Sequence, residues 1–149
     1  MAVMFADFLK RLSQPDQAPL ADDHARLALT ALLVRVARAD NDYAARERAR
    51  IDQIVQKRYA LQPEAAQTLR GEAEALEAQA PDTVRFTRAI KDAVPYEQRL
   101  SVIEAMWSVV LADGDRADEE DALLRLVSSL LGITDPDSAM ARQRVEARG

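Results

Sequence analysis

The sequence predicts an all-α protein, a compact bundle of about seven to eight helices. Apolar residues recur at helical spacing through most of the 149-residue chain, and no useful stretch alternates as a β-strand does. Prolines fall between the apolar stretches, where helices begin or end. A helix–acidic loop–helix unit occurs twice, which suggests a duplicated architecture.

Two regions are expected: residues 1–19 form an amphipathic helix and a short linker, and residues 20–149 form the helical domain. The residues that would share the apolar face of the first helix are Phe5, Phe8, Leu9 and Leu12. The start of the chain lacks the basic residues and the long apolar run of a secretory signal. We therefore expect its apolar face to dock on the body of the protein.

The domain should open with a helix, an acidic loop and a second helix. The apolar stripe of the first helix is Leu29, Leu32, Leu33 and Val36, at spacings of three and four residues. Ile51, Ile54 and Val55 continue this pattern after the loop. Pro63 is expected at the first position of the next helix, where its missing N–H has no cost.

A short helix should connect this unit to its repeat. Asp82 is its predicted N-cap, and Pro95 separates it from the helix that follows. That next helix is apolar on nearly every side and is expected at the buried centre of the fold. Its apolar residues are Val102, Ile103, Met106, Trp107, Val109, Val110 and Leu111. The helix after the second loop should end at Gly132, and Pro136 should open the last helix.

The two units align when the first is shifted by 73 residues, the separation of Asp40 from Asp113. The acids that superpose are Asp40 with Asp113, Asp42 with Asp115, and Glu47 with Glu120. Core positions coincide as well, since Leu33 meets Met106 and Val36 meets Val109. A helix hairpin cannot bury its apolar face alone, so we expect the two hairpins to pack face to face about a pseudo-twofold axis.

The acids of the two loops have two interpretations. Asp40 and Asp113 lie at C-terminal helix ends, where the helix dipole disfavours a carboxylate by about 0.3–1 kcal/mol. Either they accept hydrogen bonds from N–H groups that open the next helix, or they help to bind a divalent cation such as Ca²⁺, Mg²⁺, Mn²⁺ or Zn²⁺. We favour the first, because acidic residues commonly cap turns. The candidate metal ligands are Asp113, Asp115 and Glu120, and then Asp40, Asp42 and Glu47.

Composition argues against several function classes. A net charge of −5 does not suit a general nucleic-acid surface, which needs a basic stripe. The absence of cysteine excludes thiolate sites, and a single histidine, His24, cannot build a histidine metal cluster. The longest apolar stretches are too short to cross a bilayer. We expect Tyr43 to be exposed in the first loop, and Arg142, Arg144 and Arg148 to form a solvated face.

Three segments resemble the TerB-like family, which is named for the tellurite-resistance protein TerB and also supplies a domain of DjlA-type membrane co-chaperones. The segments are LLVRVARAD at residues 32–40, RFT at 85–87 and WSVVLADGD at 107–115. The resemblance extends from about residue 20 to the C-terminus. It implies a compact helical fold, a bacterial cytoplasmic setting and a role in tellurite or other chemical stress. It also implies metal binding through the loop acids and work within larger assemblies near the membrane. Asn41, Ala44 and Ala117 depart from the family pattern.

The sequence thus predicts a cytoplasmic, non-enzymatic, stress-associated domain that binds a partner protein, with a divalent cation at the acidic loops as a further hypothesis. The alternative is a purely structural helical adaptor without metal, whose acids only shape turns. An enzyme is the least favoured class, because paired carboxylates alone do not supply a matched acid and base.

Overall fold

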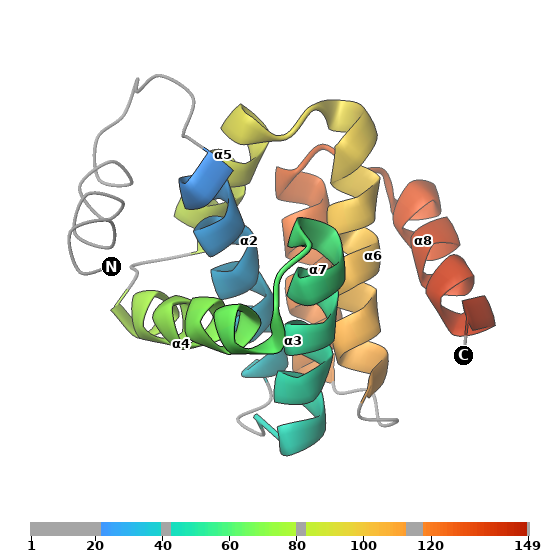
Figure 1. The fold of residues 1–149 in the computed structure, drawn as a ribbon. Coiled ribbons are helices and arrows are strands. Elements are labelled where there is room, and N and C mark those ends of the chain that lie inside the picture. Colours follow the sequence, from blue (N-terminus) through green and yellow to red (C-terminus); the bar gives the residue numbers. More distant parts are fainter. Residues whose placement is uncertain (1–21, 40–42, 80–82, 113–117, 149) are drawn as a thin grey trace.

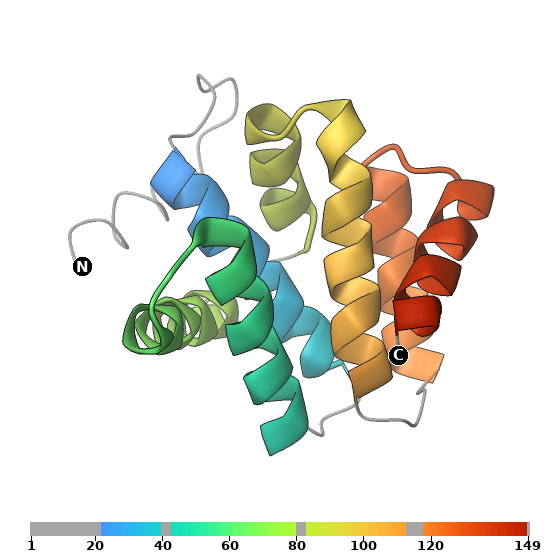
Figure 2. The same ribbon diagram turned by 45° about the vertical axis from the view of Figure 1, so that its right-hand side comes forward.

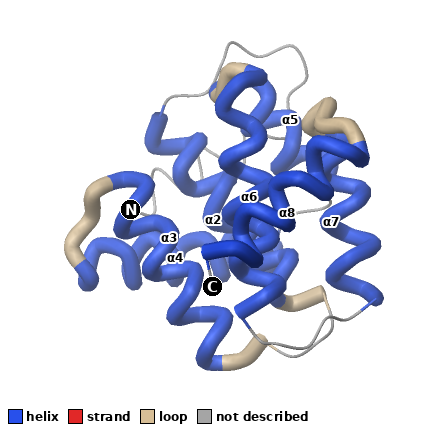
Figure 3. The backbone as a smooth tube through the Cα atoms, turned by 90° about the vertical axis from the view of Figure 1, so that its right-hand side faces the viewer, coloured by secondary structure: helices blue, strands red, loops and turns tan. Residues whose placement is uncertain are grey.

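The computed structural model describes residues 22–39, 43–79, 83–112 and 118–148, and the side chains of residues 22–24, 85, 89, 93 and 118–120 lie outside this description. Within these ranges the chain forms helices joined by loops, without a strand (Figures 1 and 3). The helices are α2 (Asp22–Ala37), α3 (Ala45–Tyr59), α4 (Pro63–Gln79), α5 (Thr83–Ala93), α6 (Tyr96–Ala112), α7 (Asp118–Leu130) and α8 (Asp135–Arg148). The predicted all-α fold is confirmed. The predicted N-terminal helix and the cap at Asp82 lie outside the described residues.

The duplication extends over three helices in each unit. Helices α2, α3 and α4 form the first unit, helices α6, α7 and α8 form the second, and α5 connects them. Helices α3 and α7 begin 73 residues apart, at Ala45 and Asp118. Helices α4 and α8 begin 72 residues apart, at Pro63 and Asp135, so the second unit is one residue shorter before its last helix.

The helix contacts between the two units follow a symmetric pattern. Within each unit the first helix packs against the third, α2 against α4 and α6 against α8 (Figures 1 and 2). Between the units α2 touches α6, α3 touches α6, and α7 touches α2. Each unit's second helix therefore contacts the other unit's first helix, as expected for a pseudo-twofold arrangement.

Helices α2 and α6 together form the centre of the fold. The prediction for α6 is confirmed: its buried residues are Val102, Ile103, Ala105, Met106, Trp107, Val109 and Val110. Helix α2 is equally central, which its sequence did not predict, and Arg35 is the one residue of 27–37 that is not buried. Alanines and Thr30, whose hydroxyl donates to the Arg26 carbonyl oxygen (2.7 Å), widen its buried surface beyond the leucine stripe. No helix in the described ranges is long and apolar enough to span a membrane.

The second helix of each unit ends in a left-handed residue. Gly132 has φ 77°, and the Ile133 N–H donates to the Ser128 carbonyl oxygen (2.8 Å), which confirms the predicted C-terminal cap. In the first unit Ala60 takes the same conformation at φ 53°, and the Leu61 N–H donates to the Gln56 carbonyl oxygen (3.0 Å). A side chain makes this conformation less favourable by about 1–2 kcal/mol, so sequence alone did not reveal this cap.

The predicted helix start at Pro63 is confirmed, whereas the one at Pro136 is wrong by one residue. Helix α8 begins at Asp135, and Pro136 is its second residue. The Thr134 hydroxyl accepts the Asp137 N–H at 3.2 Å and so caps the helix one position earlier than expected. The second helical position also lacks an intrahelical acceptor for its N–H, so proline is tolerated there.

Candidate functional site

Four helix ends lie on one side of the molecule. They are the C-terminal ends of α2 and α6 and the N-terminal ends of α3 and α7, in the lower part of Figures 1 and 2. We call this side the loop face and define it by the terminal residues Ala37, Ala45, Ala112 and Asp118. Each acidic loop connects one pair of these ends. Both loops therefore start and finish on the same side, although they are far apart in sequence.

Glu47 is the one predicted metal ligand whose side chain the structure describes. Asp40, Asp42, Asp113 and Asp115 lie outside the described residues, and Glu120 belongs to the first turn of α7 with its side chain outside the description. Among the described side chains, no group of three His, Cys, Asp or Glu residues is arranged to hold a metal ion. The metal site at the loops stays a prediction.

The Glu47 carboxylate closes the N-terminal end of α3. Its Oε1 accepts the backbone N–H of Ala44 at 3.1 Å, and the side chain is almost fully buried, with 1% exposed. This is half of a capping box, because Ala44 at the N-cap has no side-chain acceptor to return the bond. A carboxylate is also favoured here by the positive end of the helix dipole. Glu47 thus shapes the exit of the first loop, as the structural interpretation of the acids expects.

Tyr43 anchors the same loop exit and is half-buried rather than exposed, so the expectation for this residue is wrong. Its hydroxyl donates to Glu74 Oε2 at 2.6 Å. The guanidinium carbons of Arg38 and Arg48 lie 5.0 and 5.2 Å from the centre of its ring. Arg48 Nη1 also donates to the Tyr43 carbonyl oxygen at 2.7 Å. Burial, and then the hydrogen bond to Glu74, raise the pKa of Tyr43 above its ordinary value. The phenol therefore stays neutral and hydrogen-bonded at any ordinary pH.

Ion pairs extend from this anchor along α4. Glu77 binds Arg35 of α2 at 3.2 Å and Arg38, the first residue after α2, at 2.7 Å. Arg70 binds Asp52 of α3 at 2.7 Å and Glu74 at 3.0 Å. Burial lowers the pKa of the Arg70 guanidinium, but the hydrogen bond and charge of Asp52 and then Glu74 outweigh it and raise the pKa. All but Arg38 are largely shielded from solvent, so α4 fixes the C-terminal end of α2, which leads into the first loop, and the middle of α3.

The second loop leaves α6 beside a hollow of about 410 Å³. The hollow is lined by Arg50, Ser108, Leu111, Ala112, Val145, Glu146 and Arg148. Arg50 Nη1 of α3 donates to Ser108 Oγ of α6 at 3.2 Å, which joins the two units next to the loop face. No sequence pattern indicates this hollow, because its residues come from three helices.

The C-terminal arginines do more than form a solvated face. Arg144 and Arg148 are exposed, as expected, yet both pair with Glu104 on α6. Arg142 is half-buried and lies over the ring of Trp107 at 5.7 Å. These contacts fasten the last helix to α6. They could not be predicted from the sequence, because no pattern distinguishes Glu104.

Comparison with known proteins gives one family. The model of the family "Tellurite resistance protein TerB" matches residues 26–143, which is most of the chain and includes both units. No curated protein and no solved structure matched the chain. TerB is not a known enzyme family. The match contains both acidic-loop segments and the helices that flank them, and the chain therefore belongs to the TerB family.

Proposed function

We propose that this TerB-family domain is a non-enzymatic protein-interaction module that acts in the response to tellurite or related chemical stress, and that the loop face is its contact surface. The observation that carries the proposal is the convergence of four helix ends on one side (Figures 1 and 2). A single partner surface can then meet both acidic loops at once. If the partner contacts both loops, the overall affinity exceeds that of either contact alone, because the second contact forms at a high effective concentration once the first is made.

Site-specific crosslinking in cells tests this surface. We expect a photoreactive phenylalanine analogue at Ala45, the exposed first residue of α3, to crosslink to a discrete partner protein under tellurite stress. The matched control is the same analogue at Ala65, which is equally exposed in the first turns of α4 and lies away from the loop face. Equal crosslinking from both positions, or from the control alone, contradicts a binding surface at the loop face.

The proposal includes a divalent cation at the loop acids. Hard cations prefer carboxylate and carbonyl oxygens, which both loops supply in sequence. Glu47 Oε1 already accepts the Ala44 N–H, but a carboxylate offers about four lone-pair sites, so this hydrogen bond is compatible with a cation ligand. A bound cation would bring the loop carboxylates together and set their shape for a partner.

Thermal melting separates this hypothesis from its alternative. A cation that binds only the folded state raises the melting temperature, and about 100-fold excess over its Kd raises stability by about 2.7 kcal/mol. We expect Ca²⁺, Mg²⁺, Mn²⁺ or Zn²⁺ to raise it at millimolar concentration, EDTA to reverse the rise, and Asp113→Asn to remove most of it. Asp92→Asn, at an exposed position of α5, is the control with the same charge change and should keep the response.

The second candidate function is a purely structural adaptor that binds no metal. The capping hydrogen bond of Glu47 favours it, because this predicted ligand already serves the turn itself. In that case no cation shifts the melting temperature of the wild type, and Asp113→Asn behaves as the wild type does. The crosslinking result still identifies the contact surface, so the two hypotheses are tested separately.

A further inference from the structure

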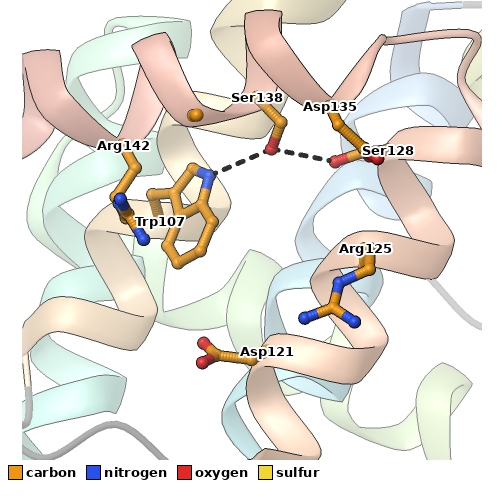
Figure 4. A pocket seen from close by; sticks show the side chains of 8 residues that line it. Trp107, Asp121, Arg125, Ser128, Asp135, Ser138 and Arg142 are labelled. Atoms are coloured by element: carbon orange, nitrogen blue, oxygen red, sulfur yellow. Dashed lines mark hydrogen bonds between the residues drawn. The ribbon is translucent and has the colours of Figure 1, made fainter.

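A pocket of about 290 Å³ opens between α6, α7 and α8, within the second unit. Its lining combines Trp107 with polar side chains of α7 and α8 (Figure 4). Figure 4 shows the guanidinium groups of Arg125 and Arg142 on either side of the indole ring. Because the fold is duplicated, each residue of this pocket has a counterpart in the first unit, and the two sets of residues can be compared.

The apolar counterparts of the pocket residues show what has changed. Trp107 and Ser128 correspond to Val34 and Val55 at a shift of 73 residues, and Ser138 corresponds to Ala66 at the shift of 72 that relates α4 to α8. Val34, Val55 and Ala66 are all fully buried. In the second unit the Trp107 Nε1–H donates to Ser138 Oγ at 3.4 Å, and the Ser128 hydroxyl donates to the same oxygen at 3.3 Å. The contact between these helices that is apolar and buried in the first unit is therefore polar and lines a pocket in the second unit.

The charged counterparts show which group is missing. In the first unit Arg70 pairs with Glu74 on its own helix and with Asp52 on the neighbouring helix. The corresponding residues are Arg142, Glu146 and Arg125. Arg142 still pairs with an acid on its own helix, because its Nε lies 3.5 Å from Glu146 Oε1. On the neighbouring helix, however, Arg125 occupies the position at which the first unit has the carboxylate of Asp52.

The two guanidinium groups differ in how they can meet a ligand. The Arg142 Nε is buried and makes no hydrogen bond to any described residue. Arg125 is exposed, and no ion pair holds it within the described part of the chain. Arginine forks suit planar carboxylates, which accept two parallel hydrogen bonds.

The other charges of the pocket set the charge of the ligand. Asp121 and Asp135 also line it and balance the two arginines. Asp135 lies in the first turn of α8, where the helix dipole stabilises a carboxylate without a cation. Two nearby acids repel a doubly charged phosphate more than a singly charged carboxylate.

We infer that this pocket binds an organic carboxylate with a flat apolar body. The carboxylate accepts hydrogen bonds from Arg125, the exposed guanidinium group, and Arg142 on the other side of the indole ring adds a second positive charge. The apolar body lies against Trp107. At about 290 Å³ the pocket is at the small end of ligand sites, so it fits a small free acid or the C-terminal residue of a peptide.

Intrinsic fluorescence tests this directly, because Trp107 is the sole tryptophan of the chain. Titration with N-benzoylglycine should change its emission saturably with a millimolar Kd, whereas the primary amide of the same compound and inorganic phosphate should not. A short peptide with a free C-terminus, compared with its amidated form, separates the two sources. Binding of the free-terminus peptide identifies a protein terminus, and binding of N-benzoylglycine alone identifies a small acid. No saturable change with either acid, or an equal change with the amide, overturns the proposal.

Variants assign the response to the two arginines. Loss of a hydrogen bond to a charged group should weaken binding at least about tenfold in Arg125→Gln, whereas Arg142→Gln removes a more distant charge and should weaken binding less. Arg88→Gln, at an exposed position of α5 outside the pocket, should bind as the wild type does. Arg125→Asp installs the carboxylate of the first unit, and we expect it to raise the melting temperature and abolish binding. Unchanged affinity in Arg125→Gln, whose exposed position makes misfolding no explanation, overturns the inference.

Discussion

Leu33→Ala and Met106→Ala are each expected to lower the free energy of unfolding by about 2–5 kcal/mol. Both side chains are fully buried, and they occupy equivalent positions of the two central helices, α2 and α6. Each truncation removes apolar contacts and leaves a cavity that neighbouring helices cannot fully close. For a chain of this length each kcal/mol lowers the melting temperature by about 2–4 °C. Urea denaturation followed by circular dichroism measures the loss.

The chain offers a matched control for each of these variants. Leu126 and Met140 have the same side chains at positions that are 47% and 52% exposed. Leu126→Ala and Met140→Ala should change stability by no more than about 0.5 kcal/mol. A small loss in Leu33→Ala beside a large one in Met106→Ala would show that α6 alone forms the centre, which contradicts the shared core described above.

Glu77→Gln is expected to cost about 1–3 kcal/mol, the second largest effect. The side chain of Glu77 is 13% exposed and pairs with both Arg35 and Arg38. The substitution keeps the shape of the side chain but removes its charge, so two guanidinium groups each lose an ion pair in a partly desolvated place. Arg38 is itself about a third exposed, and water recovers part of its loss.

The same urea titration at low and high salt measures this effect. Because the Arg35–Glu77 pair is largely shielded from solvent, most of the difference between Glu77→Gln and the wild type should persist in high salt. Asp92→Asn, an exposed acid of α5, is the control and should be nearly neutral. If Glu77→Gln is as stable as the wild type, the ion pairs do not fix α4 to α2.

The helices and most of their ends were readable from the sequence because they depend on neighbours along the chain. The spacing of Leu29, Leu33 and Val36 predicts a helix face without knowledge of what covers it. Pro63 and Gly132 act through their own backbone conformations, and both were placed correctly. The central position of α2 was missed, because alanines carry no strong apolar signal although they permit close packing.

The site was much less readable, because it depends on residues that meet across helices. Arg35 and Glu77 are 42 residues apart, and Tyr43 and Glu74 are 31 apart. No periodicity links such pairs. A turn-shaping role for the loop acids was expected, but the half capping box of Glu47 was not, because Ala44 replaces the serine or threonine that usually marks one. The pocket beside Trp107 emerges only when the two units are compared in three dimensions.

The reciprocal contacts between the units have a consequence for how such a chain can change. An ancestral single unit, if it folded, must have paired with a second copy, because α3 and α7 each complete the core of the opposite unit. A single chain that holds both units keeps them paired, and neither unit then has to stay identical to the other. One half could then specialise in rigidity, with apolar residues and closed ion pairs, while the other diverged towards an open polar cavity. Either unit expressed alone would expose the apolar surface that the other unit covers.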